Sequence, residues 1–136
     1  MPLSGTRPRP DASPEQTARR VAFVIEDDTI VAPLIEDMLR AIGYAEVWHA
    51  ETVAGALLIL GYHRPDIAVL DTNLLGVPAY RVAERLNEID VPFVVATGYD
   101  PAKLPDLLRS TVILRKPLGA ADLAAALDSV SPRGTS

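Results

Sequence analysis

Short runs of β-branched and other apolar residues constrain the fold of this 136-residue chain more than any other feature. Four such runs occupy residues 21–25, 67–70, 93–96 and 112–114, and each is apolar nearly throughout instead of alternating. A strand that is buried on both faces of a parallel sheet has this pattern. A weaker run at residues 46–49 mixes apolar and polar side chains, which suits an edge strand.

The segments between these runs have the periodicity of amphipathic helices. Apolar residues recur at intervals of three and four in residues 30–42, 79–89 and 120–130, and residues 51–60 are also predicted to be helical. Glycines directly follow the first two helices in chain order and can end them. Alternating strands and helices predict an α/β fold, a doubly wound five-stranded parallel sheet with helices on both faces.

The two ends of the chain differ in composition from the middle. Residues 1–19 are rich in proline and arginine and have few large apolar side chains. Such a segment cannot offset its ordering entropy by burial, so we expect a disordered basic arm. Residues 20–130 are predicted to form one domain, and residues 131–136 a short tail with no output domain behind it.

Composition excludes several classes of protein. The chain has no cysteine, which rules out a disulfide scaffold and thiolate zinc sites. No apolar run approaches the roughly 20 residues that a membrane span needs, and no secretory signal is recognisable, so a cytoplasmic protein without membrane insertion is expected. The formal net charge of −5 also argues against direct binding of nucleic acid.

Polar residues stand where the predicted strands end. Glu26 and Asp27 follow the first run, Asp71 follows the 67–70 run, and Thr97 and Lys116 follow the last two. Ligands of such sheets bind beyond the carboxyl ends of the strands, so these side chains should converge there. Clustered carboxylates favour Mg²⁺, and a nearby lysine suits a phosphoryl oxygen. Asp71 is then the candidate nucleophile, because aspartate can form acyl phosphates.

Four motifs in this order resemble the receiver domain of two-component response regulators, the fold of the chemotaxis regulator. They are Val-Ala-Phe-Val-Ile-Glu-Asp-Asp at 21–28, Pro-Asp-Ile-Ala-Val-Leu-Asp-Thr-Asn at 65–73, Ala-Thr-Gly at 96–98 and Leu-Arg-Lys-Pro at 114–117. The resemblance covers about residues 20–130, so it makes the predicted domain a receiver domain. It implies the strand order 2-1-3-4-5.

The resemblance also implies a magnesium site. Asp71 would be the phosphoacceptor and would contribute to Mg²⁺ binding. Asp27 would hold the ion directly, Glu26 would hold it through water, and the main-chain carbonyl of Asn73 would be a further ligand.

Two other residues would contact the transferred group. Thr97 would bond a phosphoryl oxygen and reorient on phosphorylation. Lys116 would form a salt bridge to the phosphoryl group, and the Lys116–Pro117 peptide bond would be cis.

The function that the resemblance implies is a stand-alone signalling switch or a phosphate shuttle. A histidine kinase or a histidine phosphotransfer protein would donate the phosphoryl group. The domain would not be an enzyme in the usual sense, because it would catalyse only its own phosphorylation and autodephosphorylation. Phosphorylation would switch a surface that binds a downstream protein, which the sequence does not name.

The chain departs from common receivers at two places. Ile113 stands where they have a switch aromatic on the last strand. Pro101 and Pro105 disfavour a long fourth helix, which is therefore predicted to be short or irregular. Residues 92–99, Pro-Phe-Val-Val-Ala-Thr-Gly-Tyr, are similar to a signature of single-domain alphaproteobacterial receivers, and Tyr99 could replace the missing aromatic.

Other interpretations stay open. A magnesium-dependent phosphatase of similar topology would need a second aspartate where Asn73 stands, and a phosphorylation-independent adaptor would keep the carboxylates without using them. Asp28 is predicted to begin the first helix as a cap, the alternative being a metal contact. His49 and His63 are expected at the surface or in loops, and Trp48 is expected to serve packing.

Overall fold

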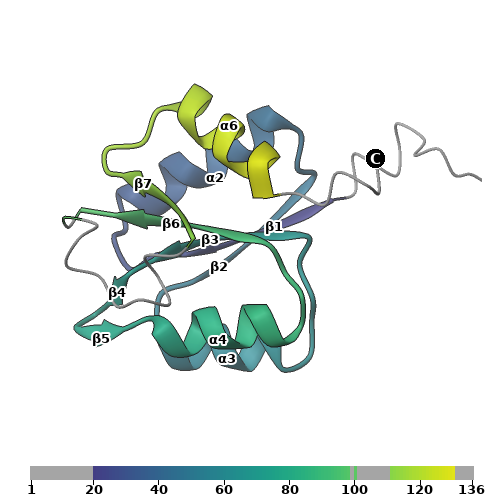
Figure 1. Ribbon diagram of the computed structural model, residues 1–136, viewed down its shortest axis with the longest axis vertical. Helices are drawn as coiled ribbons and strands as arrows, with labels where there is room; N and C mark the ends of the chain where they lie inside the picture. The colour runs from purple at the N-terminus through teal and green to yellow at the C-terminus, as the bar shows by residue number, and fades with distance from the viewer. Residues whose placement is uncertain (1–19, 99, 101–110, 131–136) are drawn as a thin grey trace, which may run out of the picture.

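The computed structural model describes residues 20–98, 100 and 111–130, and it consists of a parallel sheet between two layers of helices (Figure 1). The sheet has five strands in the order β2-β1-β3-β6-β7, all parallel. The strands are β1 (Val21–Ile25), β2 (Glu46–Ala50), β3 (Ile67–Asp71), β6 (Phe93–Thr97) and β7 (Val112–Arg115). The predicted fold class and the predicted strand order are both confirmed.

Among the described residues, two helices cover each face of the sheet. In Figure 1, α2 (Val31–Ile42) and α6 (Ala120–Val130) lie above it, and α3 (Val53–Leu60) and α4 (Tyr80–Glu88) lie below it. The bounds of these four helices, the ones that lie in the described part of the chain, were predicted to within two residues. No helix among the described ranges is long and apolar enough to cross a membrane.

Three sequence-based predictions fall on parts of the chain that the structure does not describe. They concern the basic arm at residues 1–19, the tail at residues 131–136, and the fourth helix around Pro101 and Pro105. Tyr99, the predicted replacement for the missing aromatic, also lies outside the described residues.

The central strands are buried on both faces because their side chains enter two separate cores. Alternate residues of a strand point to opposite faces. Phe23 and Ile25 of β1 therefore join the core under α3 and α4, whereas Ala22 and Val24 join the core under α2 and α6. Each large apolar side chain that is fully buried in this way contributes about 1.5–3 kcal/mol. The uninterrupted apolar runs of the sequence follow from this double burial.

Helix α2 is fixed at both ends by local chemistry. The carboxylate of Asp28 accepts hydrogen bonds from the amides of Ile30 (2.8 Å) and Val31 (3.1 Å), which lack partners inside the helix. These two bonds also hold the pKa of Asp28 below its usual value. Gly43 ends the helix with φ at 132°, a conformation that other residues adopt with strain. The predicted capping role of Asp28 is confirmed.

A small hairpin directly after β3 was not predicted. It joins β4 (Asn73–Leu74) to β5 (Val77–Pro78) through Leu75 and Gly76, whose φ angles are 52° and 87°. Positive φ at both central residues is typical of the two-residue turn that suits the twist of antiparallel strands. The side chain of Asn73 stabilises the turn by accepting a hydrogen bond from the amide of Gly76 at 2.8 Å.

The single tryptophan has a packing role, as predicted. The Trp48 ring meets Phe23 edge to face at 6.2 Å and His63 at 5.7 Å. Ile113, at the position of the missing aromatic, is half-buried and packs against the core under α3 and α4.

Candidate functional site

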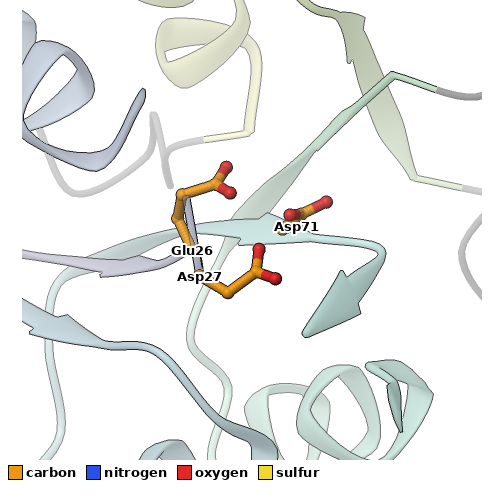
Figure 2. A group of neighbouring side chains, drawn as sticks. All are labelled: Glu26, Asp27 and Asp71. Atoms are coloured by element: carbon orange, nitrogen blue, oxygen red, sulfur yellow. The ribbon is translucent and has the colours of Figure 1, made fainter. Parts of the chain in front are cut away.

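The candidate site lies at the edge of the sheet where the parallel strands end. Glu26 and Asp27 directly follow β1, Asp71 is the last residue of β3, Thr97 is the last residue of β6, and Lys116 directly follows β7. Carboxylate oxygens of the three acidic residues lie within 4.8 Å of one another. Figure 2 shows these carboxylates around a common space, with Glu26 and Asp27 reaching it from different sides.

Strand alternation explains how two consecutive residues serve one site. If the alternation continues past the end of β1, Glu26 follows Ala22 and Val24 toward the α2 and α6 face. Asp27 then points in the same direction as Phe23 and Ile25, toward the face covered by α3 and α4, where the hairpin lies. Asp71, which alternates with the residues of β3 in the same way, shares the face of Glu26.

Lys116 pairs with two carboxylates. Its Nζ lies 2.6 Å from Glu26 Oε1 and 3.2 Å from Asp71 Oδ2. Its amide donates to the carbonyl oxygen of Thr97 at 2.8 Å, which extends the pairing of β6 with β7, and the following peptide bond to Pro117 is cis as expected. Burial by itself lowers the pKa of Lys116, but the two carboxylates more than offset it, so the pKa lies above its usual value.

Glu26 is the most perturbed group of the site. It is almost fully buried, and burial raises its pKa from 4.5 to about 7, with the neighbouring Asp71 carboxylate adding to the rise and Lys116 opposing it. The amide of Asp28 donates to Oε2 at 3.1 Å. Apart from the Lys116 ammonium, Oε1 has no hydrogen-bond partner among the described residues.

Asp27 is ionised more readily than an ordinary aspartate. Desolvation would raise its pKa, but hydrogen bonds from the backbone amides, first that of Leu75, hold the pKa below the usual value. The Leu75 amide at the tip of the hairpin lies 2.9 Å from Asp27 Oδ2. The hairpin therefore fixes one carboxylate of the site from outside the sheet.

Asp71 is held at the edge by the residue that follows it. The amide of Thr72 donates to Asp71 Oδ1 at 2.7 Å, while Oδ2 faces Lys116. The hydroxyl of Thr72 lies 3.1 Å from the hydroxyl of Thr97, and both side chains are buried. One oxygen of Asp71 is thus oriented by the backbone and the other by a cation.

Three contributions to the site were missed in the sequence. The Leu75 amide and the Thr72 hydroxyl carry no pattern that distinguishes them from other loop atoms. His49 was expected only as a surface residue, and it is exposed, but its Nε2 also lies 2.8 Å from the main-chain carbonyl of Glu26. Because a carbonyl only accepts, Nε2 carries the proton in this bond. His49 Nδ1 faces Glu36 at 3.9 Å.

The donor set suits a hard cation. All three carboxylates offer oxygen ligands, and repulsion between them is relieved when a cation binds. The buried Glu26 Oε1, which has the Lys116 ammonium as its partner, is available to a bound ion or to its water shell. The cluster of Glu26, Asp27 and Asp71 could therefore hold a metal ion.

Comparisons with known proteins give curated relatives of the chain and solved structures with its fold. No protein-family model matches the chain. It is 26% identical over 129 residues to the transcriptional regulatory protein PdtaR of Mycobacterium tuberculosis, covering 90% of this chain and 61% of that protein. The chain thus spans about three-fifths of the length of this curated relative.

Solved structures show the same fold. SdrG from Sphingomonas melonis Fr1 superposes with a TM-score of 0.74 and is 34% identical, covering 83% of this chain and 97% of that one. The receiver domain of the sensor histidine kinase PA1611 from Pseudomonas aeruginosa, at 22% identity, has a TM-score of 0.70 over 82% of this chain and 96% of that domain. The chain belongs to the response regulator receiver domains, the signalling modules of two-component systems.

Proposed function

We propose that this domain is a magnesium-dependent phosphoacceptor in which Asp71 takes a phosphoryl group from a phosphohistidine. The donor would be a histidine kinase or a histidine phosphotransfer protein. The observation that carries the proposal is the convergence of three carboxylates and the Lys116 ammonium at the end of the sheet. The structure of the PA1611 receiver domain, which has magnesium coordinated in its active site cleft, supports the choice of ion.

The chemistry is a transfer between two nucleophiles. An oxygen of Asp71 forms a bond to phosphorus while the bond between phosphorus and the donor imidazole breaks. The electron pair of that bond returns to the imidazole, which takes up a proton. In such transfers the protein acts mainly by positioning and by offsetting charge. The Thr72 amide, at 2.7 Å from Oδ1, positions the Asp71 carboxylate for this step.

The residues around Asp71 would bind the magnesium ion and offset the charge of the phosphoryl group. Asp27, Asp71 and the main-chain carbonyl of Asn73 would hold Mg²⁺ directly, and Glu26 would hold it through water. The ion, when bound, offsets charge on the transferred group. Lys116, already 3.2 Å from Asp71 Oδ2, is placed to pair with a phosphoryl oxygen.

Phosphorylation would then change a protein-binding surface. Thr97 lies buried at the end of β6, the strand that pairs with the one carrying Asp71, and would reorient to bond a phosphoryl oxygen there. The signature at residues 92–99 supports placing the domain in the single-domain subclass of receivers, in which output is the binding of another protein. The cognate kinase and the downstream target are to be identified by experiment.

A hydrolase of external phosphate esters is a weaker candidate. Such an enzyme needs an acid–base group two residues after the nucleophile, and Asn73 stands there. The side-chain oxygen of Asn73 is already occupied by the amide of Gly76. An amide held in this way neither donates nor accepts a proton for turnover.

A phosphotransfer assay tests the proposed function. The purified chain is incubated with Mg²⁺ and either acetyl phosphate or phosphorylated histidine kinases of the same organism, and its intact mass is measured. We expect one phosphoryl group on the wild-type chain and none on Asp71→Asn. Steady release of phosphate from a model ester would instead indicate a hydrolase, and no modification by any donor would favour an adaptor.

A further inference from the structure

A pair of buried hydroxyl groups lies beside the proposed phosphoacceptor. The Oγ1 atoms of Thr72 and Thr97 are 3.1 Å apart, within hydrogen-bond distance. Thr72 is 6% exposed and Thr97 is fully buried, so water does not compete freely for either group. The pairing of β3 with β6 brings the two residues together, because Asp71 is the partner of Ala96 and these two residues are followed directly by Thr72 and Thr97.

Strand alternation assigns this hydroxyl pair to the opposite face of the sheet from the Asp71 carboxylate. In β3, Leu70 belongs to the core under α3 and α4, and alternation gives Thr72 the same side. In β6, Val95 also belongs to that core, and alternation places the Thr97 side chain on the same face of the sheet. Asp71 alternates with Val69, which belongs to the other core. In the proposed function the Thr97 hydroxyl reorients to bond a phosphoryl oxygen on Asp71, and this reorientation takes it away from Thr72.

We propose that Thr72 is a positioning residue that holds the hydroxyl of Thr97 in its resting orientation and so opposes activation. This inference rests on the proposed function, in which Thr97 bonds the phosphoryl group. When Thr97 turns, the buried hydroxyl of Thr72 loses its partner, and an unsatisfied buried hydroxyl is costly. Thr72 thus shifts the equilibrium between the two orientations of the Thr97 hydroxyl toward the resting one.

Two substitutions separate the hydroxyl from the shape of the side chain. Thr72→Val removes the hydroxyl and keeps the β-branched volume, whereas Thr72→Ser keeps the hydroxyl and loses only a methyl group. The probe is beryllofluoride with saturating Mg²⁺, which stands in for the phosphoryl group on Asp71. Its apparent affinity for the full chain is measured by titration, and the resonances of Thr97 are followed by NMR.

We expect Thr72→Val to bind beryllofluoride about fivefold more tightly than the wild type, the factor that corresponds to one neutral hydrogen bond. Before any beryllofluoride is added, the Thr97 resonances of this variant should already lie part of the way toward their bound positions. Thr72→Ser should resemble the wild type in both measurements. A purely structural role would change the thermal stability of the variants without this shift in affinity.

Other results would overturn the inference. Unchanged or weaker binding of beryllofluoride by Thr72→Val, with Thr72→Ser normal, would show that Thr72 does not oppose activation. If Thr72→Val fails to fold, a Thr72→Ser variant whose Thr97 resonances already lie at the bound positions would overturn it equally. If the wild type itself does not bind beryllofluoride, the proposed function of Asp71 fails together with the inference about Thr72. If the wild type binds it and only the Thr72 variants behave otherwise than expected, the inference about Thr72 fails alone.

Discussion

The ammonium of Lys116 lies closer to Glu26 than to Asp71, at 2.6 Å against 3.2 Å. Its nearer partner is thus a buried carboxylate that is not the proposed nucleophile. Moving the ammonium toward a phosphoryl group on Asp71 requires little displacement, because it already bridges the two acids. Glu26 therefore keeps the cation in place while the phosphoacceptor is empty.

Removal of this cation should destabilise the domain in a pH-dependent way. Lys116→Met leaves Glu26 and Asp71 facing each other without a counter-charge, and breaking a buried pair in this way costs about 3 kcal/mol. The loss should be largest near pH 8, where Glu26 is ionised, and smaller near pH 5, where it is protonated. Urea unfolding without Mg²⁺ at the two pH values measures the difference. Equal losses at both would contradict the proposed ionisation of Glu26.

The raised pKa of Glu26 predicts that the metal-free domain loses stability as pH rises. The folded state binds the proton more tightly than the unfolded chain, since the pKa is about 7 in the fold and 4.5 as the usual value. The contribution of this proton to the free energy of unfolding is fully present below pH 4.5 and is lost as the pH rises to about 7. We expect a decline on the order of 1–3 kcal/mol across this window. Glu26→Gln, which cannot ionise, should remove most of the slope in urea unfolding.

Neighbouring aspartates should differ sharply in their effect on magnesium binding. Asp27→Asn removes the charge from a proposed ligand and should weaken Mg²⁺ binding at least about tenfold. Asp28→Asn is a matched control, because asparagine caps a helix as well as aspartate does and Asp28 is engaged with the amides of Ile30 and Val31. Isothermal titration calorimetry measures both affinities. A comparable loss in the two variants would argue against Asp27 as a specific ligand.

The turn of the hairpin offers a stabilising substitution. Leu75 has φ at 52° and a largely exposed side chain, so it bears the cost of a left-handed conformation with little compensation from burial. Leu75→Asn keeps the amide that binds Asp27 and suits this conformation better, and should stabilise the domain by about 0.5–1 kcal/mol. Thermal unfolding measures the gain, while an unaltered affinity for Mg²⁺ would show that the amide still holds Asp27.

The sheet and most of the site could be predicted because their signals are local. Burial on both faces leaves an apolar run such as residues 67–70, and the parallel order then places the residue after each run at one edge. Asp71 and Lys116 were found in this way. The same reasoning gave the cap at Asp28, since a short carboxylate before an amphipathic segment satisfies the free amides of a helix.

The interactions that the sequence did not reveal depend on atoms without a distinctive residue type. The hairpin turn uses Leu75, which rarely adopts positive φ, so nothing in its identity indicated a turn. The hydroxyl pair of Thr72 and Thr97 joins residues 25 positions apart and depends on the exact register of β3 with β6. Contacts of this kind follow from tertiary geometry and become visible only in the folded chain.

The alternation at the end of β1 places two consecutive acids in environments that shift their pKa values in opposite directions. Glu26 tends to keep its proton and Asp27 tends to lose it, although one peptide bond separates them. A slip of β1 by a single position against its neighbours would exchange these environments and place the wrong acid beside Lys116. The ladders to β2 and β3 on both sides of β1 prevent that slip, so backbone pairing far from any reacting atom decides which acid has the raised pKa.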